Sequence, residues 1–265
     1  MGVESTSIEV GQPTRLGGFD IQKVGEKADF VKILIYGVPG SGKTYLAGQA
    51  ATVEGMAPVL FIDMEGGTKT IRNLYPEVEV VRVQDEFDGN GRLKRSSWKA
   101  LQDVYEDLRK GVKYKTIVID SLTEAQKVSM YSVLQQAMLS ATRERDPDIP
   151  EMRDWGKSGE QVRRFVRAFR DLPSHVIFTA LQADTKDQMT GAVTSKPALP
   201  GKLADEIPAY LDEVLYLYTK SGKEGVERKI LTEPTGKYLA KDRSGRLPTV
   251  VSDPTMSKLA EAILD

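Results

Sequence analysis

The sequence contains no cysteine and a single histidine, His175, among its 265 residues. The absence of cysteine excludes disulfides and thiolate metal sites. The histidine precedes the apolar stretch Val176–Phe178, where it is expected at the edge of a strand. A histidine-based metal or catalytic centre is therefore not predicted.

Long apolar runs and a surplus of charge of one sign are also missing. No run approaches the ~20 apolar residues of a membrane-spanning helix, and the N-terminus lacks the apolar stretch of a secretory signal. We therefore expect a cytoplasmic protein. The formal net charge is −1, whereas a free-standing nucleic-acid binder usually carries a basic surplus. Any nucleic-acid site must be local, built from loops or assembled by several subunits.

The chain is expected to form one domain, because no low-complexity linker divides its 265 residues. Residues 1–20 are polar and contain glycine, which predicts a flexible N-terminal arm, and residues 21–265 are predicted to form a single core. Strands are expected at Val31–Tyr36, Pro58–Asp63, Val78–Val83, Thr116–Asp120, His175–Leu181, Glu213–Tyr218 and Arg228–Thr232. Helices are expected at Tyr45–Thr52, Ser97–Lys110, Glu124–Ala141 and around Val162–Phe169. This alternation predicts an α/β fold with a parallel sheet.

The residues Gly37–Thr44 match the phosphate-binding pattern G-x-x-x-x-G-K-[ST]. A predicted strand precedes them and a predicted helix follows, which is the context that the pattern requires. The glycines let backbone N–H groups wrap a polyphosphate, Lys43 reaches the terminal phosphates, and the Thr44 hydroxyl can hold Mg²⁺. The predicted nucleotide-binding residues are Gly37, Val38, Pro39, Gly40, Ser41, Gly42, Lys43, Thr44 and Tyr45.

A second feature is Asp120, which ends the apolar run Thr116–Ile119. A carboxylate at the end of a buried strand next to a phosphate loop is typical of a group that supports Mg²⁺, most often through water. The alternative is that Asp120 caps the next helix. The phosphate loop upstream favours the metal role.

A third feature is Glu65, just past the predicted strand Pro58–Asp63. Ligands and catalytic groups of open α/β sheets gather beyond the carboxyl ends of the strands. Glu65 is therefore predicted to orient and deprotonate an attacking water. The alternative is that Glu65 caps a short helix near Thr68–Leu74.

On these motifs the chain resembles the RecA-like ATPases over about Val31 to Arg246. The stretch around Asp63 and Glu65 looks like the family's strand with the catalytic glutamate, Val118–Ser121 looks like its Walker B strand, and Val176–Gln182 looks like the strand that ends in the sensor glutamine. The resemblance is closest to the shortened RecA-like phage proteins that promote single-strand annealing and recombination, a phage AAA-type nucleotide-binding family. It implies an ATPase that uses ATP and Mg²⁺, with Gln182 sensing the γ-phosphate.

The segment Lys241–Gly245 further resembles the K-N-R-F-G motif of RadA-type relatives, with Asp in place of Asn and Ser in place of Phe. By this resemblance, Lys241 and Arg243 would act on the nucleotide of a neighbouring subunit. The departures from the motif leave a charged surface turn as the alternative.

The resemblance also makes two long polar segments candidates for DNA-binding loops. The first, Thr142–Gly159, contributes the candidates Arg143, Arg145, Trp155 and Lys157. The second, Ala183–Asp205, contributes Lys186, Lys196 and Lys202. Cations and an occasional aromatic surface are what single strands require. The first segment also carries five acidic residues, so a solvated connection is the alternative there.

The resulting hypothesis is an ATPase stimulated by single-stranded DNA that promotes strand annealing or exchange as a homo-oligomer, in a filament or a ring. A single-strand-binding protein is an expected further partner, and a bacterial host cell is the expected location if the protein is phage-encoded. Two alternatives stay open: an AAA-type motor or helicase loader, and a non-hydrolysing ATP switch that docks a replication partner. Motors of the first kind generally follow the core with a helical lid, whereas the strand-like segment Glu213–Tyr218 follows it here.

Overall fold

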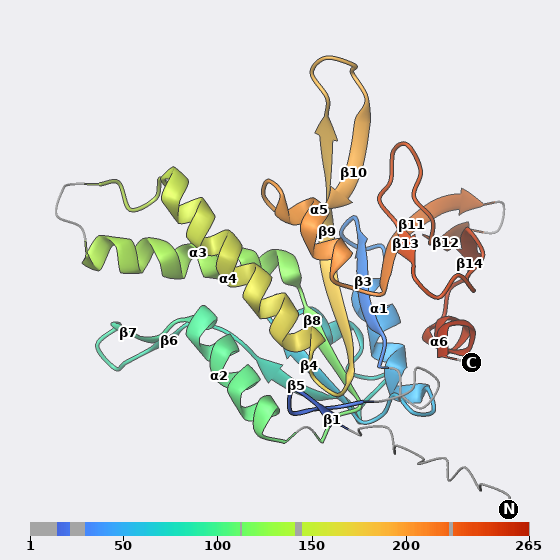
Figure 1. Cartoon of the computed structure of the whole chain (residues 1–265), viewed down its shortest axis with the longest axis horizontal. Helices are drawn as coiled ribbons and strands as arrows, with labels where there is room; N and C mark the ends of the chain where they lie inside the picture. The colour runs from blue at the N-terminus through green and yellow to red at the C-terminus, as the bar shows by residue number, and fades with distance from the viewer. Residues whose placement is uncertain (1–14, 22–29, 112, 141–144, 223–224, 265) are drawn as a thin grey trace, which may run out of the picture.

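The computed structural model describes residues 15–21, 30–111, 113–140, 145–222 and 225–264 (Figure 1). Most of the predicted arm, residues 1–14, and the candidate Arg143 lie outside the described residues. The described part of the arm contains a short hairpin of β1 (Arg15–Leu16) and β2 (Phe19–Asp20). The division into an arm and a single core stays a prediction.

A 10-stranded sheet forms the centre of the protein (Figure 1). Its main path runs in the order β14-β12-β11-β3-β9-β8-β4-β5, with β10 beside β9 and β13 beside β11. Neighbours from β11 to β5 along this path are parallel, and the remaining pairs are antiparallel. The strands are β3 (Lys32–Gly37), β4 (Val59–Asp63), β5 (Glu79–Arg82), β8 (Thr116–Asp120), β9 (His175–Lys186), β10 (Val193–Pro197), β11 (Glu213–Gly222), β12 (Gly225–Leu231), β13 (Lys241–Asp242) and β14 (Val250–Ser252). A separate hairpin pairs β6 (Glu86–Phe87) with β7 (Leu93–Arg95).

Helices cover both faces of the sheet. The face with Leu34 carries α2 (Ser97–Lys110), α3 (Leu122–Leu139), α4 (Met152–Arg170) and α5 (Leu203–Ala209). The face with Ile33 carries α1 (Lys43–Gly48) and α6 (Met256–Leu264). Among the described residues, no helix combines the length and the apolar character that a membrane crossing needs.

The central strands pack against the helices on both faces of the sheet, because alternate residues of each strand are buried on opposite sides. Along β3, Leu34 and Tyr36 enter one hydrophobic cluster, whereas Ile33 and Ile35 enter the other. A strand buried on both faces reads as a continuous apolar run, which is how the sequence marks it. Each large side chain buried in this way contributes about 1.5–3 kcal/mol.

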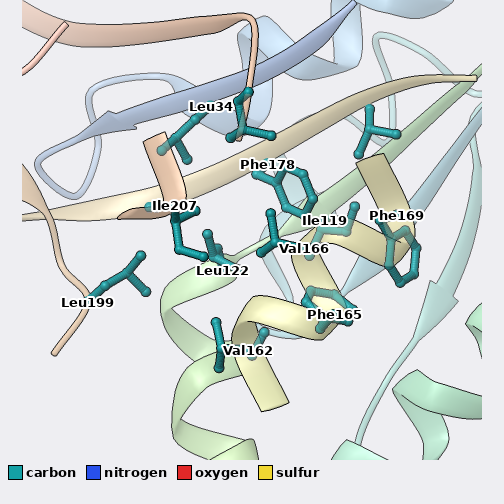
Figure 2. Close-up of a cluster of buried hydrophobic side chains, with 14 of the residues drawn as sticks. Leu34, Ile119, Leu122, Val162, Phe165, Val166, Phe169, Phe178, Leu199 and Ile207 are labelled. Carbon is teal, nitrogen blue, oxygen red and sulfur yellow. The ribbon is translucent and has the colours of Figure 1, made fainter. Parts of the chain in front are cut away.

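Figure 2 shows the larger cluster, with side chains of the sheet such as Ile119 and Phe178 directed toward α4. The α4 side chains that meet them are Val162, Phe165, Val166 and Phe169. This is the apolar face that the i, i+3, i+4, i+7 spacing predicts.

The predicted α/β fold, with a mostly parallel central sheet flanked by helices, is confirmed. Strand β9 lies between the phosphate-loop strand β3 and strand β8, which ends in Asp120. Strand β11 lies parallel to β3, and β12 pairs with β11 in antiparallel orientation. The sequence predicts both strands, with the shorter bounds Glu213–Tyr218 and Arg228–Thr232. Helix α2 has the predicted bounds, Ser97–Lys110.

The predicted loop Thr142–Gly159 is wrong in its second half, because α4 begins at Met152. The buried side of the first turns is small and polar rather than apolar, and Ser158 Oγ lies 3.1 Å from Ser129 Oγ of α3. The Asp154 carboxylate accepts a hydrogen bond from the backbone N–H of Glu151 at 2.8 Å, which fixes the helix start. An apolar-periodicity search does not detect a helix face of this kind.

The predicted loop Ala183–Asp205 is also wrong, because β9 continues to Lys186 and pairs with β10. Figure 1 shows this β9–β10 hairpin projecting beyond the rest of the sheet. The Asp187 carboxylate closes its turn by accepting from the Met189 and Thr190 N–H groups, and Gly191 adopts φ 70°. Both strands are polar near the tip, so the apolar alternation that marks a half-buried strand is absent there.

Two predicted helices are shorter than expected. The helix after the phosphate loop is α1, followed by a 3₁₀ turn, η2 (Gln49–Thr52). The short helix expected near Thr68–Leu74 is a 3₁₀ turn, η3 (Gly67–Thr70).

The histidine at the start of β9 has a structural role. His175 is buried, and its Nδ1 accepts a hydrogen bond from the Val31 N–H at 3.1 Å. Burial, helped by the charge of Lys32, lowers the pKa of His175 to about 4. Its place as the first residue of β9 agrees with the predicted position at the edge of a strand.

Candidate functional site

The phosphate loop lies at the carboxyl end of β3. Gly40 and Gly42 adopt positive φ angles of 77° and 106°, which only glycine adopts without strain. The Lys43 ammonium is buried and donates to the carbonyls of Gly37 and Val38, at 3.0 Å each. Burial lowers the pKa of Lys43, while the nearby carboxylates of Asp120 and Glu65 oppose that shift.

Asp120 is brought to this loop by the strand register. Its Oδ2 accepts a hydrogen bond from Thr44 Oγ1 at 2.8 Å, and its Oδ1 accepts one from Thr179 Oγ1 of β9. Burial raises the pKa of Asp120, and the carboxylate of Asp63 adds to the rise, whereas the two hydroxyl groups and Lys43 oppose it. The predicted partners Thr44 and Asp120 are therefore in direct contact.

The oxygens of this pair fit a magnesium ion that takes its other ligands from a nucleotide and water. A methyl group at Gly67 would lie 2.9 Å from Asp120 Oδ2 and 3.4 Å from Thr44 Oγ1, so only glycine leaves this side of the pair open. Within the described ranges, no group of three or more His, Cys, Asp or Glu side chains could hold a metal by itself. A metal at Thr44 and Asp120 would depend on ligand oxygens from outside the protein.

Glu65 is exposed at the end of β4, and its carboxylate accepts a hydrogen bond from Ser121 Oγ. It does not cap the short helix, because Asp63 takes that role. The Asp63 carboxylate is fully buried and accepts from the N–H groups of Gly66 and Gly67 at 2.6 and 3.2 Å. Burial alone would raise the pKa of Asp63, but hydrogen bonds from Thr68, Gly66 and Gly67 lower it below its ordinary value. Asp63 thus holds the turn that presents Glu65.

Gln182 lies at the root of the β9–β10 hairpin. The preceding residue, Leu181, pairs with Gly37, the first residue of the phosphate loop. The Gln182 amide Nε2 donates to Asp184 Oδ1 at 2.7 Å, and Ser195 Oγ of β10 donates to the same oxygen at 2.7 Å. Gln182 Nε2 also lies 3.4 Å from Ser195 Oγ, so the predicted sensor is bonded to both strands of the hairpin.

Lys241 and Arg243 lie near the amino ends of β11 and β3, whereas the phosphate loop follows the carboxyl end of β3. Lys241 Nζ donates to the Leu211 carbonyl at 2.5 Å, and Arg243 Nη1 donates to Asp212 Oδ1 at 2.6 Å. The Asp212 N–H in turn bonds the carbonyl of Lys32, the first residue of β3. Strand β3 separates this corner from the phosphate loop by roughly 16 Å, at about 3.3 Å per residue. The pair therefore does not face the phosphate loop of its own chain.

The candidate DNA-binding residues differ in availability. Arg145 forms a buried ion pair with Asp154, with side-chain exposures of 3% and 4%. Trp155 is 43% exposed on α4, and Lys157 Nζ donates to Gln136 Oε1 at 3.1 Å. Three lysines belong to the second candidate segment: Lys186 and Lys202 are exposed, and Lys196 pairs with Asp205 at 2.6 Å.

Sequence reasoning missed three contributors, Asp63, Ser121 and Thr179. Asp63 carries a usable signal, because it is followed by Gly66-Gly67-Thr68, and aspartates commonly bond the N–H groups of such turns. Ser121 and Thr179 carry none, since each acts only through a neighbour brought close by the sheet.

In a comparison with protein families, a family model described as an AAA domain matches residues 29–244. Comparison with curated proteins gave no match. Among solved structures, the crystal structure of a KaiC-like protein from the hyperthermophilic archaeon Pyrococcus horikoshii is similar, with a TM-score of 0.42 and 16% sequence identity. That match covers 76% of this chain and 78% of the other. Similarity at this level says nothing about ligands or partners.

Proposed function

The chain belongs to the AAA domain family, and we propose that it is an ATPase that assembles on single-stranded DNA and promotes strand annealing or exchange. The observation that carries the proposal is the position of Gln182, next to the phosphate loop in the sheet register and bonded to both strands of the β9–β10 hairpin. A side chain so connected can transmit the state of the nucleotide to a projecting surface.

Each residue of the nucleotide site has a role in this proposal. The loop N–H groups and Lys43 bind the phosphates, and Thr44 with Asp120 holds the metal. A bound Mg²⁺ would neutralise phosphate charge. Glu65 accepts the proton of the attacking water, oriented by its hydrogen bond from Ser121. Gln182 would sense the γ-phosphate, as the motif resemblance implies.

The β9–β10 hairpin is the proposed DNA-binding element, together with the start of α5. Its residues from Ala183 to Ala192 are exposed, with Lys186 near the tip and Lys202 at the entry to α5. A cationic element that tracks the phosphate backbone suits single strands. The assignment to phage-type annealing proteins, with a single-strand-binding protein as partner, rests on the motif resemblance alone.

The strand pair β11–β12 favours this function over a protein-directed motor or a helicase loader. After the core strand β9, the chain returns to the sheet with β11 and β12, and the described helices that follow β9 are α5 and α6, of 7 and 9 residues. A multi-helix lid of the kind that such motors carry is absent from the described part of the chain. Turnover measured with and without single-stranded DNA separates the functions, because a passive switch shows none and a protein-directed motor ignores the DNA.

Gly67→Ala is expected to raise the magnesium concentration needed for half-maximal ATP turnover by about 10-fold or more, the scale of second-sphere changes at metal sites. The added methyl group would collide with Oδ2 of Asp120. The carboxylate cannot easily move away, because Thr44 donates to Oδ2 and Thr179 donates to Oδ1. A magnesium titration at saturating ATP measures the effect.

Gly89→Ala is the matched control for this titration, because a methyl group there meets no atom within 4 Å. An unchanged magnesium requirement in Gly67→Ala would remove the Thr44 and Asp120 pair from the metal site.

Replacing Lys186, Lys196 and Lys202 together by alanine is expected to flatten the salt dependence of DNA binding. Each phosphate contact contributes about −0.7 to the log-log slope for single strands, so three lost contacts would reduce its magnitude by about 2. Fluorescence anisotropy with a labelled oligonucleotide, in the presence of ATP and at several salt concentrations, measures the slope.

A charge-matched control replaces Lys99, Lys110 and Lys113, which pair with carboxylates elsewhere on the surface. Equal slopes in the two triple variants would exclude the hairpin lysines from the DNA-binding surface. Retained ATP binding in both variants shows that the phosphate loop is intact.

A further inference from the structure

An arginine from a distant strand lies against the phosphate loop. A methyl group built on Gly42 would lie 3.1 Å from Nε and 3.5 Å from Cδ of Arg228, so the stem of this side chain touches the loop just before Lys43. Arg228 belongs to β12 and pairs with Thr219 of β11. Ile230 lies two residues further along β12, in the hydrophobic cluster that also contains Leu46 of α1. Arg228 therefore continues the face of β12 that covers α1, toward the phosphate loop.

The charge of Arg228 is not compensated by the described part of the protein. Its guanidinium forms no ion pair or side-chain hydrogen bond with a described residue, and the neighbouring carboxylate of Glu227 pairs instead with Lys229 at 3.1 Å. Gly42, the loop residue that Arg228 touches, is followed directly by Lys43, which carries a second positive charge. Two cations around one loop favour a ligand with several negative charges.

We propose that Arg228 binds the phosphates of the nucleotide held by the Gly37–Thr44 loop of its own chain. This inference rests on the proposed ATP-binding function and adds a binding residue to it. The backbone of a phosphate loop surrounds the α- and β-phosphates, and Arg228 touches the loop at Gly42 rather than at the tip of Lys43. We therefore assign Arg228 to phosphates that ATP and ADP share. A guanidinium can donate two parallel hydrogen bonds to a phosphate, which an ammonium cannot match in geometry.

The test compares the full-length protein with Arg228→Ala and Arg228→Lys, with ADP and ATP each titrated by isothermal calorimetry. Arg228→Ala is expected to weaken both nucleotides by about 10- to 100-fold, the range of a lost hydrogen bond to a charged group. Arg228→Lys should fall between wild type and Arg228→Ala. Lys220→Ala is the control, because it removes a cation from the same hairpin on the opposite face of the strand pair, and it should bind both nucleotides like wild type.

The outcomes separate this inference from the function it rests on. If wild type binds nucleotide and Arg228→Ala binds ADP equally well, the inference is wrong and the proposed function stands. If wild type binds neither nucleotide, the proposed function fails first. Arg228 is exposed, so its removal should leave thermal unfolding without nucleotide unchanged; if Arg228→Ala does not fold, Arg228→Gln replaces it and faces the same affinity criterion.

Action within one chain is tested by mixing Arg228→Ala with Lys43→Ala. No subunit of such a mixed oligomer contains both residues. At an ATP concentration too low to saturate Arg228→Ala, turnover of the mixture should therefore stay as low as that of Arg228→Ala alone. Recovered turnover would assign Arg228 to a neighbour's nucleotide and overturn the inference.

Discussion

Glu65→Gln is expected to lower ATP turnover at least ~100-fold while ATP and Mg²⁺ binding persist, which is the scale of a lost general base. The Glu65 carboxylate is held by the Ser121 hydroxyl and by the turn that Asp63 organises. Glutamine has the same shape and can still accept the bond from Ser121, but it cannot take a proton from water. Steady-state turnover and nucleotide affinity, measured on the same preparation, separate the two effects.

Glu77→Gln is the control for Glu65→Gln, because it neutralises an exposed carboxylate outside the nucleotide site. Unaltered turnover in Glu65→Gln would end its assignment as the base. A loss of ATP affinity equal to the loss of turnover would reassign Glu65 from catalysis to binding.

Arg243→Ala is expected to reduce DNA-stimulated ATP turnover by ~10³- to 10⁵-fold. This is the effect of removing an arginine that one subunit supplies to stabilise the negative charge of the transition state in another. The structure gives this prediction a geometric reason. Arg243 is bonded to Asp212, which is hydrogen-bonded to Lys32 at the start of β3, whereas the phosphate loop follows the end of β3. If Arg243 meets a nucleotide, that nucleotide would therefore have to belong to another subunit.

Mixing separates action in trans from a structural effect. Arg243→Ala keeps an intact phosphate loop and Lys43→Ala keeps an intact Arg243, so mixed oligomers should regain part of the turnover that each variant lacks. Arg109→Ala, which removes an exposed arginine from α2, controls for the loss of charge. A mixture that co-assembles but stays inactive, or an Arg243→Ala protein with normal turnover on DNA, would refute the role.

The sheet was largely predictable because its central strands are buried on both faces. Runs such as Ile33–Tyr36 and Ile117–Ile119 are continuous in apolar residues, and burial fixes them as strands. The β9–β10 hairpin was not predictable in this way. Its stability depends on backbone pairing and on the turn closed by Asp187, and neither produces an apolar pattern. The start of α4 was missed for a related reason, since its buried side carries Ser158 and Gly159.

The residues of the candidate site also fall into two groups, those that a local sequence pattern marks and those that it does not. Lys43, Thr44 and Asp120 could be predicted because a contiguous motif and the end of an apolar strand mark them, and the structure brings Thr44 and Asp120 into contact. Thr179 and Arg228 could not, because they reach the loop from strands distant in sequence. Arg145 shows the converse: a cation in a polar segment looks available for DNA, yet it is buried against Asp154.

The placement of Arg243 and the phosphate loop at opposite ends of β3 has a consequence for the symmetry of an assembly. In a head-to-tail stack, each subunit would present its arginine edge to the loop edge of the next, which is a heterologous contact. Such contacts either close into a ring or continue as an open helix. An open helix always has one terminal subunit whose loop faces no arginine. Hydrolysis per subunit would then rise with the length of the helix, and nucleotide would persist longest at one end, giving the polymer a chemical polarity along the DNA.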